Sequence, residues 1–181
     1  MIPWHSQQNW EIMSRNLLVI VATFFILAII QILLLKYFVL FGVGFCFLYL
    51  LALLLLPIEI SFISAMVLGL LLGLTVDLFY NTIGIHAAAS VFVMFIRPYW
   101  MSANKPRSGY EMTDLPMIAN YGLAWFITYS FPLIAIHAFT VFMLESGGQL
   151  VGLSVVKMLA TSVISLVFML AIQYLFYSKS K

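Results

Sequence analysis

The feature that most constrains this chain is an almost wholly apolar run over residues 17–58, in which Lys36 is the only charge. As a single helix the run would be roughly 63 Å long, about twice the thickness of the hydrocarbon core of a bilayer. The run must therefore double back. We expect the reversal between Lys36, the charge in the run, and Gly42, a turn-forming residue. We expect a first helical span over 17–35 and a second over 40–56.

The composition predicts an integral membrane protein. Hydrophobic residues make up 65% of the 181 residues and charged residues only 8%, whereas a soluble domain carries about 25% charged residues. A single cysteine, Cys46, excludes an intrachain disulfide and a cysteine metal cluster. The net charge of +2 comes from few residues and gives no reason to expect a nucleic-acid partner.

The remaining apolar segments predict four more helical spans, and so an all-α polytopic membrane protein with six transmembrane helices. We expect these spans at 61–79, 85–100, 119–144 and 150–177, with one long polar loop over 102–118. The chain then consists of a polar N-terminal segment over 1–16, a single transmembrane domain over 17–177 and a short tail over 178–181.

The stretch from Pro57 to Arg97 is apolar enough to lie in lipid, yet it contains the ionisable residues Glu59, Asp77 and His86. A carboxylate costs roughly 2.5–3.5 kcal/mol at the centre of a membrane helix, so a local interaction must offset the charge. Small residues precede Asp77 at intervals of four and share one helical face with it. They are Ser61, Ala65, Gly69 and Gly73. We expect Ala65, Gly69 and Gly73 to form a close helix-packing face, since Gly69 and Gly73 form a GxxxG pattern.

Asp77 lies at the C-terminal end of its predicted helix, where the macrodipole disfavours an anion. Asn81 and Gly84 supply turn-forming residues, and His86 opens the next predicted helix. We expect Asp77 and His86 to face each other across this hairpin. Three interpretations stay open here: a structural tie within the turn, a partner-binding feature, and a ligand or proton site.

The distribution of basic residues predicts that both termini are cytoplasmic. With six spans and an inner N-terminus, the inner face holds Arg15, Arg97, Lys105, Arg107, Lys179 and Lys181, and the outer face holds Lys36 and Lys157. Asp77, His86 and Glu145 then lie toward the outer face. Candidate residues for inner-face contacts are Pro57, Glu59, Arg97, Lys105 and Arg107, with Arg97 expected as an interfacial anchor.

Motifs for catalysis are missing from the sequence. No GxSxG, HExxH or P-loop occurs, and no serine or cysteine at an obvious spacing completes a triad with Asp77 and His86. We therefore assign no catalytic, cofactor-binding or metal-binding residues, and expect a protein that works through helix packing and protein contacts.

The run L-G-L-L-L-G-L-T-V-D-L-F-Y-N-T-I-G-I-H-A-A-A-S resembles the signature of the bacterial rod shape-determining protein MreD family. The matching positions are Gly69, Gly73, Asp77, Gly84 and His86. The resemblance implies a multi-pass protein of the bacterial inner (cytoplasmic) membrane that acts as a non-catalytic scaffold of the cell-wall elongation (rod) complex. It implies contact with MreC and, indirectly, with MreB, RodA and a class B penicillin-binding protein. It also implies a fold similar to the substrate-binding subunits of energy-coupling-factor transporters.

Two other functions remain open on the sequence. A small-molecule uptake subunit of the vitamin-transporter type would need polar groups that converge on a cavity, and the mid-membrane candidates are Gln31, His137 and Thr140. An intramembrane enzyme would depend on His86 or His137. A copurifying metabolite would favour the first, and a turnover abolished by His86→Ala or His137→Ala would favour the second.

Overall fold

A computed structural model describes residues 21–107, 109–110 and 115–177, and the described chain is helical, with no strand beyond an isolated bridge between Leu40 and Gly44. The first helix, Val21–Leu35, ends in the π-helix η1 (Gln31–Leu35). The other helices are α2 (Leu50–Leu54), α3 (Phe62–Tyr80), α4 (Ile85–Ala103), α5 (Ile118–Tyr121), α6 (Leu123–Glu145) and α7 (Val151–Tyr177). The predicted terminal segments 1–16 and 178–181 lie outside the described residues, as does part of the 102–118 loop.

Three of the described helices are long and apolar enough to cross a membrane: α3, α6 and α7. Together with the apolar composition, this supports the prediction of a membrane-embedded protein. The helix predicted over 119–144 is split, because Gly122 has a φ of 83° and separates α5 from α6. Only glycine adopts this backbone conformation without strain.

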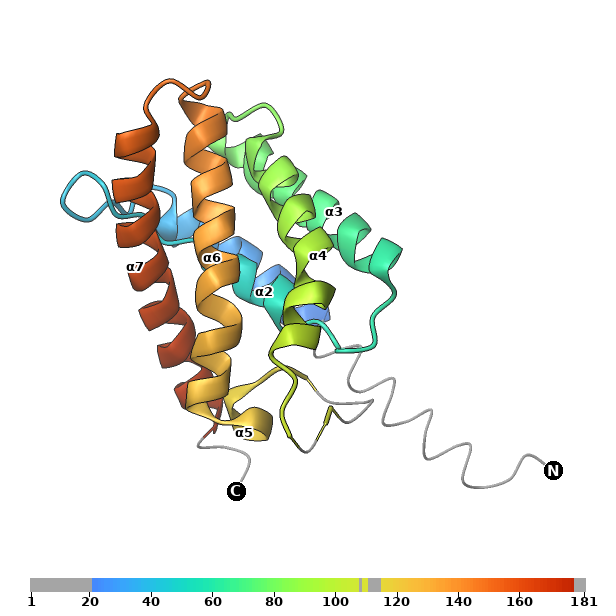
Figure 1. Ribbon diagram of the computed structural model, residues 1–181. Coiled ribbons are helices and arrows are strands. Elements are labelled where there is room, and N and C mark those ends of the chain that lie inside the picture. Colours follow the sequence, from blue (N-terminus) through green and yellow to red (C-terminus); the bar gives the residue numbers. More distant parts are fainter. Residues whose placement is uncertain (1–20, 108, 111–114, 178–181) are drawn as a thin grey trace.

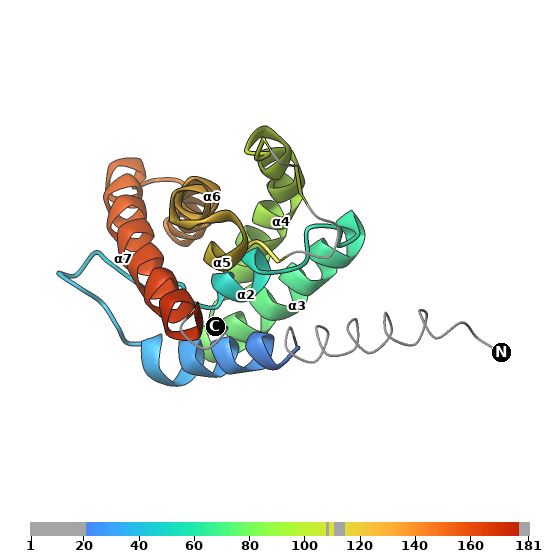
Figure 2. The same cartoon turned by 90° about the horizontal axis from the view of Figure 1, so that it is seen from below.

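The long helices form a ring around residues 40–56, which we call the central segment (Figures 1 and 2). Seen from below in Figure 2, α3, α4, α6, α7 and the first helix surround α2. We call the upper end in Figure 1 the turn end, because it carries the turns 81–84 and 146–150. The opposite end, with α5 and the connection from α4, is the loop end.

The prediction of a second helical span over 40–56 is wrong. Residues 40–49 form turns, irregular chain and the isolated Leu40–Gly44 bridge, and only the five residues of α2 are helical. Phe41 and Gly42 both have positive φ, 53° and 72°, which turns the chain back on itself. The rest of the central segment is deeply buried, since each of residues 46–54 is at most 4% exposed.

Side chains of the surrounding helices satisfy the irregular backbone of this central segment. Thr161 of α7 accepts a hydrogen bond from Phe45 N (3.1 Å), and Ser165 accepts one from Phe47 N (2.9 Å). Gln31 accepts from Leu48 N (2.7 Å) and donates to Cys46 O (2.9 Å). Non-helical backbone at membrane depth is tolerated only where the protein itself supplies hydrogen-bond partners, and these side chains supply them.

The C-terminal end of the central segment is held in the same way. The Tyr129 hydroxyl of α6 donates to Leu54 O (2.8 Å), and the Arg97 guanidinium of α4 donates to Leu56 O. Arg97 also donates from Nε to Tyr129 Oη (2.8 Å). Arg97 is 3% exposed, so the expectation that it is an interfacial anchor is wrong. The carbonyls that end α2 attract this cation into the bundle.

The small-residue face packs α3 closely against α4, as the GxxxG pattern predicts. A Cβ atom added at Gly73 would lie 2.6 Å from Ala87 N, and one added at Gly69 would lie 3.2 Å from Ser90 O. Ala65, on the same face, is buried. This contact fixes the geometry of the turn that joins the two helices.

Candidate functional site

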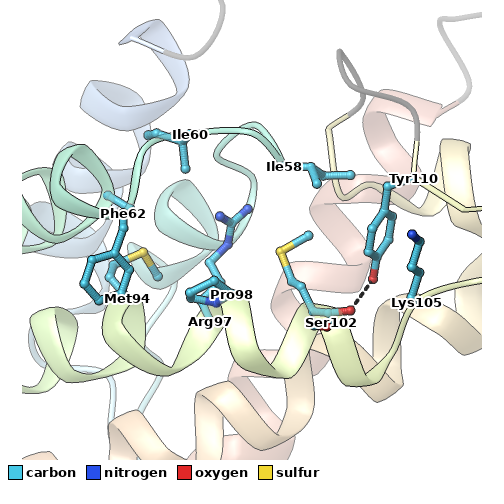
Figure 3. A pocket seen from close by; sticks show the side chains of 11 residues that line it. Ile58, Ile60, Phe62, Met94, Arg97, Pro98, Ser102, Lys105 and Tyr110 are labelled. Atoms are coloured by element: carbon cyan, nitrogen blue, oxygen red, sulfur yellow. Dashed lines mark hydrogen bonds between the residues drawn. The ribbon is translucent and has the colours of Figure 1, made fainter.

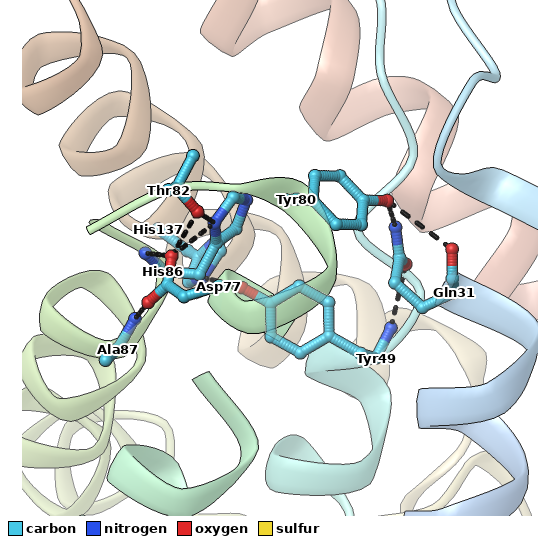
Figure 4. A network of polar contacts seen from close by, with 8 residues as sticks. All are labelled: Gln31, Tyr49, Asp77, Tyr80, Thr82, His86, Ala87 and His137. Atoms are coloured by element: carbon cyan, nitrogen blue, oxygen red, sulfur yellow. Dashed lines mark hydrogen bonds and ion pairs between the residues drawn. The ribbon is translucent and has the colours of Figure 1, made fainter. Parts of the chain in front are cut away.

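The turn between α3 and α4 is organised by the carboxylate of Asp77, which is 3% exposed. Its Oδ1 accepts hydrogen bonds from His86 N (3.0 Å), from His86 Nδ1 (3.0 Å) and from the Thr82 hydroxyl. Its Oδ2 accepts from Ala87 N (2.9 Å). Asp77 and His86 therefore face each other across the hairpin, as predicted, and Figure 4 shows the pair.

These contacts explain how a carboxylate is accommodated at the C-terminal end of α3. His86 and Ala87 are in the first turn of α4, whose backbone N–H groups have no partner within the helix. The positive end of the α4 dipole thus offsets the negative end of the α3 dipole at the position of Asp77. The sequence predicts an unfavourable position for the Asp77 carboxylate, and the N-terminal end of α4 compensates for it.

The backbone of the turn depends on the two residues selected from the sequence. Asn81 ends α3 with a φ of 56°, and Gly84 precedes α4 with a φ of 75°. Both are left-handed conformations, which asparagine and glycine adopt more readily than other residues. Because an ionised carboxylate only accepts hydrogen bonds, this contact assigns the ring proton of His86 to Nδ1, which donates a hydrogen bond to Asp77 Oδ1.

A polar network continues from the turn into the centre of the bundle (Figure 4). The Tyr80 ring lies 5.2 Å from the His86 ring, and its hydroxyl accepts from Gln31 Nε2 (2.7 Å). Deeper in the bundle, Tyr49 Oη and His137 Nε2 are 2.7 Å apart. The network connects the turn with the central segment, so it stabilises the relative positions of α3, α4, α6 and the first helix.

Gln31, His137 and Thr140, the residues considered for a ligand site, are each bonded within the protein. Gln31 is bonded to the central segment, His137 to Tyr49, and Thr140 donates to Ile136 O within its own helix (2.8 Å). The trio therefore contributes to packing in the described structure.

A small cavity of about 160 Å³ lies at the turn end, next to His86 and Thr82. Lys36 and Glu145 also line it, which places the residues assigned to the outer face at one end of the molecule. Lys157 Nζ lies 3.9 Å from Glu145 Oε2 at the same end. Cavities that bind small molecules are usually about 300–1,000 Å³, so this one is small for a metabolite.

A larger cavity of about 310 Å³ lies at the loop end, between α4 and the connection from α2 to α3 (Figure 3). Arg97 forms part of its wall, and Lys105 and Tyr110 lie at its other side. Burial raises the pKa of the Tyr110 phenol above its usual value, so the hydroxyl stays protonated and donates to Met101 O (2.8 Å). Of the other inner-face candidates, Glu59 and Arg107 are exposed and Pro57 is half-buried.

An apolar groove runs along the outer surface of α3 and α4, with a volume of about 620 Å³. Its lining consists of Met66, Leu70, Leu74, Gly84, Ala87, Ala88, Val91, Phe92 and Phe95. The groove begins at the turn that Asp77 holds. Three of its lining residues, Gly84, Ala87 and Ala88, are small, which leaves the α4 backbone open to close approach near the turn end.

The described residues contain no group of three or more His, Cys, Asp or Glu side chains that could hold a metal ion. The Asp77–His86 pair is bonded within the turn, and the hydroxyl beside it is that of Thr82, which donates to Asp77 and lies 3.2 Å from His86 Nδ1. The arrangement can hold two helices together and orient the groove beside them.

Several structurally important residues were missed by the sequence analysis. Thr161 and Ser165 bond the central segment, Tyr129 holds its far end, and Tyr49 bonds His137. Thr161 and Ser165 are spaced by four in an otherwise apolar helix, and this spacing was a usable signal. The tyrosines gave no such signal, since the sequence does not tell which aromatic hydroxyls are buried.

Comparison of the chain with protein-family models, with curated proteins and with solved structures found no match.

Proposed function

We propose that this protein is a non-catalytic scaffold of the bacterial inner membrane that belongs to the cell-wall elongation (rod) complex, as its resemblance to the MreD family implies. The observation that carries the proposal is a rigid α3–α4 hairpin with an apolar groove on its outer surface. Asp77 and His86 act as the structural tie of that hairpin, and the groove beside them is the partner surface.

The groove suits a membrane-spanning helix. In lipid, helices associate through van der Waals contact and close backbone approach, and small residues at the interface promote both. Ala88 is exposed in the groove, and Gly84 and Ala87 lie beside it. Phe92 and Phe95, both exposed, extend the apolar surface along α4. A single-pass partner such as MreC would present one such helix, and MreB, RodA and a class B penicillin-binding protein would join through it.

We propose six crossings with both termini cytoplasmic. The first helix, α3, α4, α6 and α7 account for five crossings, and the central segment, which runs from the turn end to the loop end, accounts for the sixth. The loop end carries Lys105 and Arg107, and a cytoplasmic excess of basic residues determines orientation in most membrane proteins. On this basis the loop end is cytoplasmic, and the turn end faces the periplasm.

Affinity purification of the tagged chain from its own cells in mild detergent, followed by mass spectrometry of proteins and small molecules, tests the proposal. We expect a single-pass MreC-type protein to copurify, and Ala88→Trp to reduce its yield by about tenfold or more because the ring fills the groove. Val163→Trp is the matched control, since Val163 is exposed on α7, away from the groove.

Recovery of a bound metabolite together with an ATPase module would contradict the scaffold function and favour an uptake subunit. Equal partner yield from both tryptophan variants would contradict the role of the groove. Folding of each variant is checked by its elution volume in size-exclusion chromatography, so that a lost partner is not confused with a misfolded chain.

A further inference from the structure

The loop-end cavity contains a buried cation for which the described residues supply no counter-ion. Arg97 is 3% exposed and lies on α4 at the wall of the cavity. The ion pairs among the described residues are His86–Asp77 and Lys157–Glu145, and both lie at the turn end. A buried charge without a counter-ion is unfavourable, and in membrane proteins such a residue usually marks a binding site.

The guanidinium keeps hydrogen-bonding capacity for a ligand. It has five N–H donors, and its contacts among the described residues are one bond from Nε to Tyr129 Oη and one from Nη2 to Leu56 O. These two bonds fix the plane of the group. In Figure 3 the guanidinium points from α4 toward the connection that carries Ile58 and Ile60.

A second cation lines the same cavity. Arg97 and Met101 lie four residues apart on one face of α4, and Lys105 follows directly after the helix, which ends at Ala103. Lys105 is exposed, which places it at the mouth of the cavity. Ser102 adds a hydroxyl between the two cations. The polar part of the cavity is therefore basic, from its inner wall to its mouth.

The opposite wall of the cavity is apolar. Ile58, Ile60 and Phe62 line it, and Phe62 is 41% exposed at the start of α3. A cavity with one basic and one apolar wall, at the end of the membrane-spanning helices, matches an amphiphile with an anionic head. Arginine binds phosphate oxygens in a bidentate manner, and basic pockets between membrane helices bind anionic headgroups.

We propose that the loop-end cavity binds the phosphate of an anionic phospholipid headgroup, with Arg97 at the inner wall and Lys105 at the mouth. The acyl chains leave the cavity past Phe62 toward the lipid. The site is separate from the α3–α4 groove, so its occupancy does not depend on the scaffold function.

Native mass spectrometry of the full-length chain, delipidated in a neutral detergent and titrated with phosphatidylglycerol or phosphatidylcholine, tests this site. We expect phosphatidylglycerol to bind on the order of tenfold more tightly, and Lys105→Gln to remove most of that preference. Arg107→Gln is the matched control, because Arg107 is exposed, lies nearby and is not part of the cavity lining. Arg97→Lys retains the charge but loses the bidentate geometry, so it should bind phosphatidylglycerol more weakly than the unmodified chain.

Equal binding of the two lipids, or equal effects of Lys105→Gln and Arg107→Gln, would overturn the proposal. A parallel titration with inorganic phosphate and glycerol 3-phosphate distinguishes a lipid from a soluble ligand. We expect neither to displace phosphatidylglycerol at millimolar concentration. If either compound displaces phosphatidylglycerol from the unmodified chain, and no longer binds to Lys105→Gln, the site binds a soluble phosphate and the proposal of a lipid ligand is wrong.

Discussion

Asp77 joins the C-terminal end of α3, which disfavours a carboxylate, to the N-terminal end of α4, which favours one: both the backbone N and the Nδ1 of His86 lie 3.0 Å from Asp77 Oδ1. The acid lies in the last turn of α3 and at the same time caps the first turn of α4. The pair explains why an acid can be buried in a stretch this apolar, and why the groove beside it has a defined shape.

Replacing the carboxylate of Asp77 should loosen the turn. In Asp77→Asn one oxygen becomes an NH₂ donor and must face either Ala87 N or the donors on His86 and Thr82, so an N–H group at the start of α4 loses its acceptor. We expect a loss of about 1–3 kcal/mol in the free energy of unfolding, measured as a lower midpoint of thermal unfolding in detergent. Glu59→Gln, at an exposed acid, should leave the midpoint unchanged. An unchanged midpoint in Asp77→Asn would show that the carboxylate is not needed.

A side chain at Gly73 should separate α3 from α4. The added Cβ would lie 2.7 Å from His86 O, and that backbone cannot move without disturbing the turn. Gly73→Leu should therefore cost at least about 1–3 kcal/mol and lower the yield of folded protein on size-exclusion chromatography. Gly152→Leu is the control, because an added Cβ there meets nothing within 4 Å and leucine favours a helix over glycine. Equal behaviour of the two variants would refute the close packing.

The side-chain bonds to the central segment can be tested by removing their hydroxyls. Thr161→Val with Ser165→Ala leaves Phe45 N and Phe47 N without acceptors, at about 1–3 kcal/mol for each buried group. Hydrogen–deuterium exchange should then be faster at residues 45–49. Ser162→Ala serves as control, since Ser162 donates only to Met158 O within α7. Unchanged exchange in the double variant would mean that other groups hold the segment.

The long helices and their turn could be predicted from the sequence because local signals specify them. The predicted span over 61–79 differs from α3 by one residue at each end, and α4 begins at Ile85 as expected. The contact of Asp77 with His86 also followed from local spacing. These features depend on apolar length, on turn residues and on residues that are near in sequence.

The central segment and Arg97 could not be predicted, because both depend on contacts between distant parts of the chain. An apolar run over 40–56 predicts a helix by itself. A non-helical backbone is tolerable there because side chains from other parts of the chain bond it, among them Gln31 and two hydroxyls of α7 more than 100 residues later. Arg97 looks like an interfacial anchor until the carbonyl of Leu56 is known to lie beside it. The loop-end cavity, which Arg97 lines, depends on the same distant contacts, so the sequence did not predict it either.

Site-specific photocrosslinking in living cells tests the central claim most directly, since it reports what lies in the α3–α4 groove without detergent. A photoreactive amino acid at Ala88 should form an adduct with the membrane helix of a single-pass partner of the MreC type, and the same group at Val163 should not. No protein adduct from Ala88, in cells where the partner still copurifies with the chain, would contradict the claim that this groove is where the scaffold holds its partner.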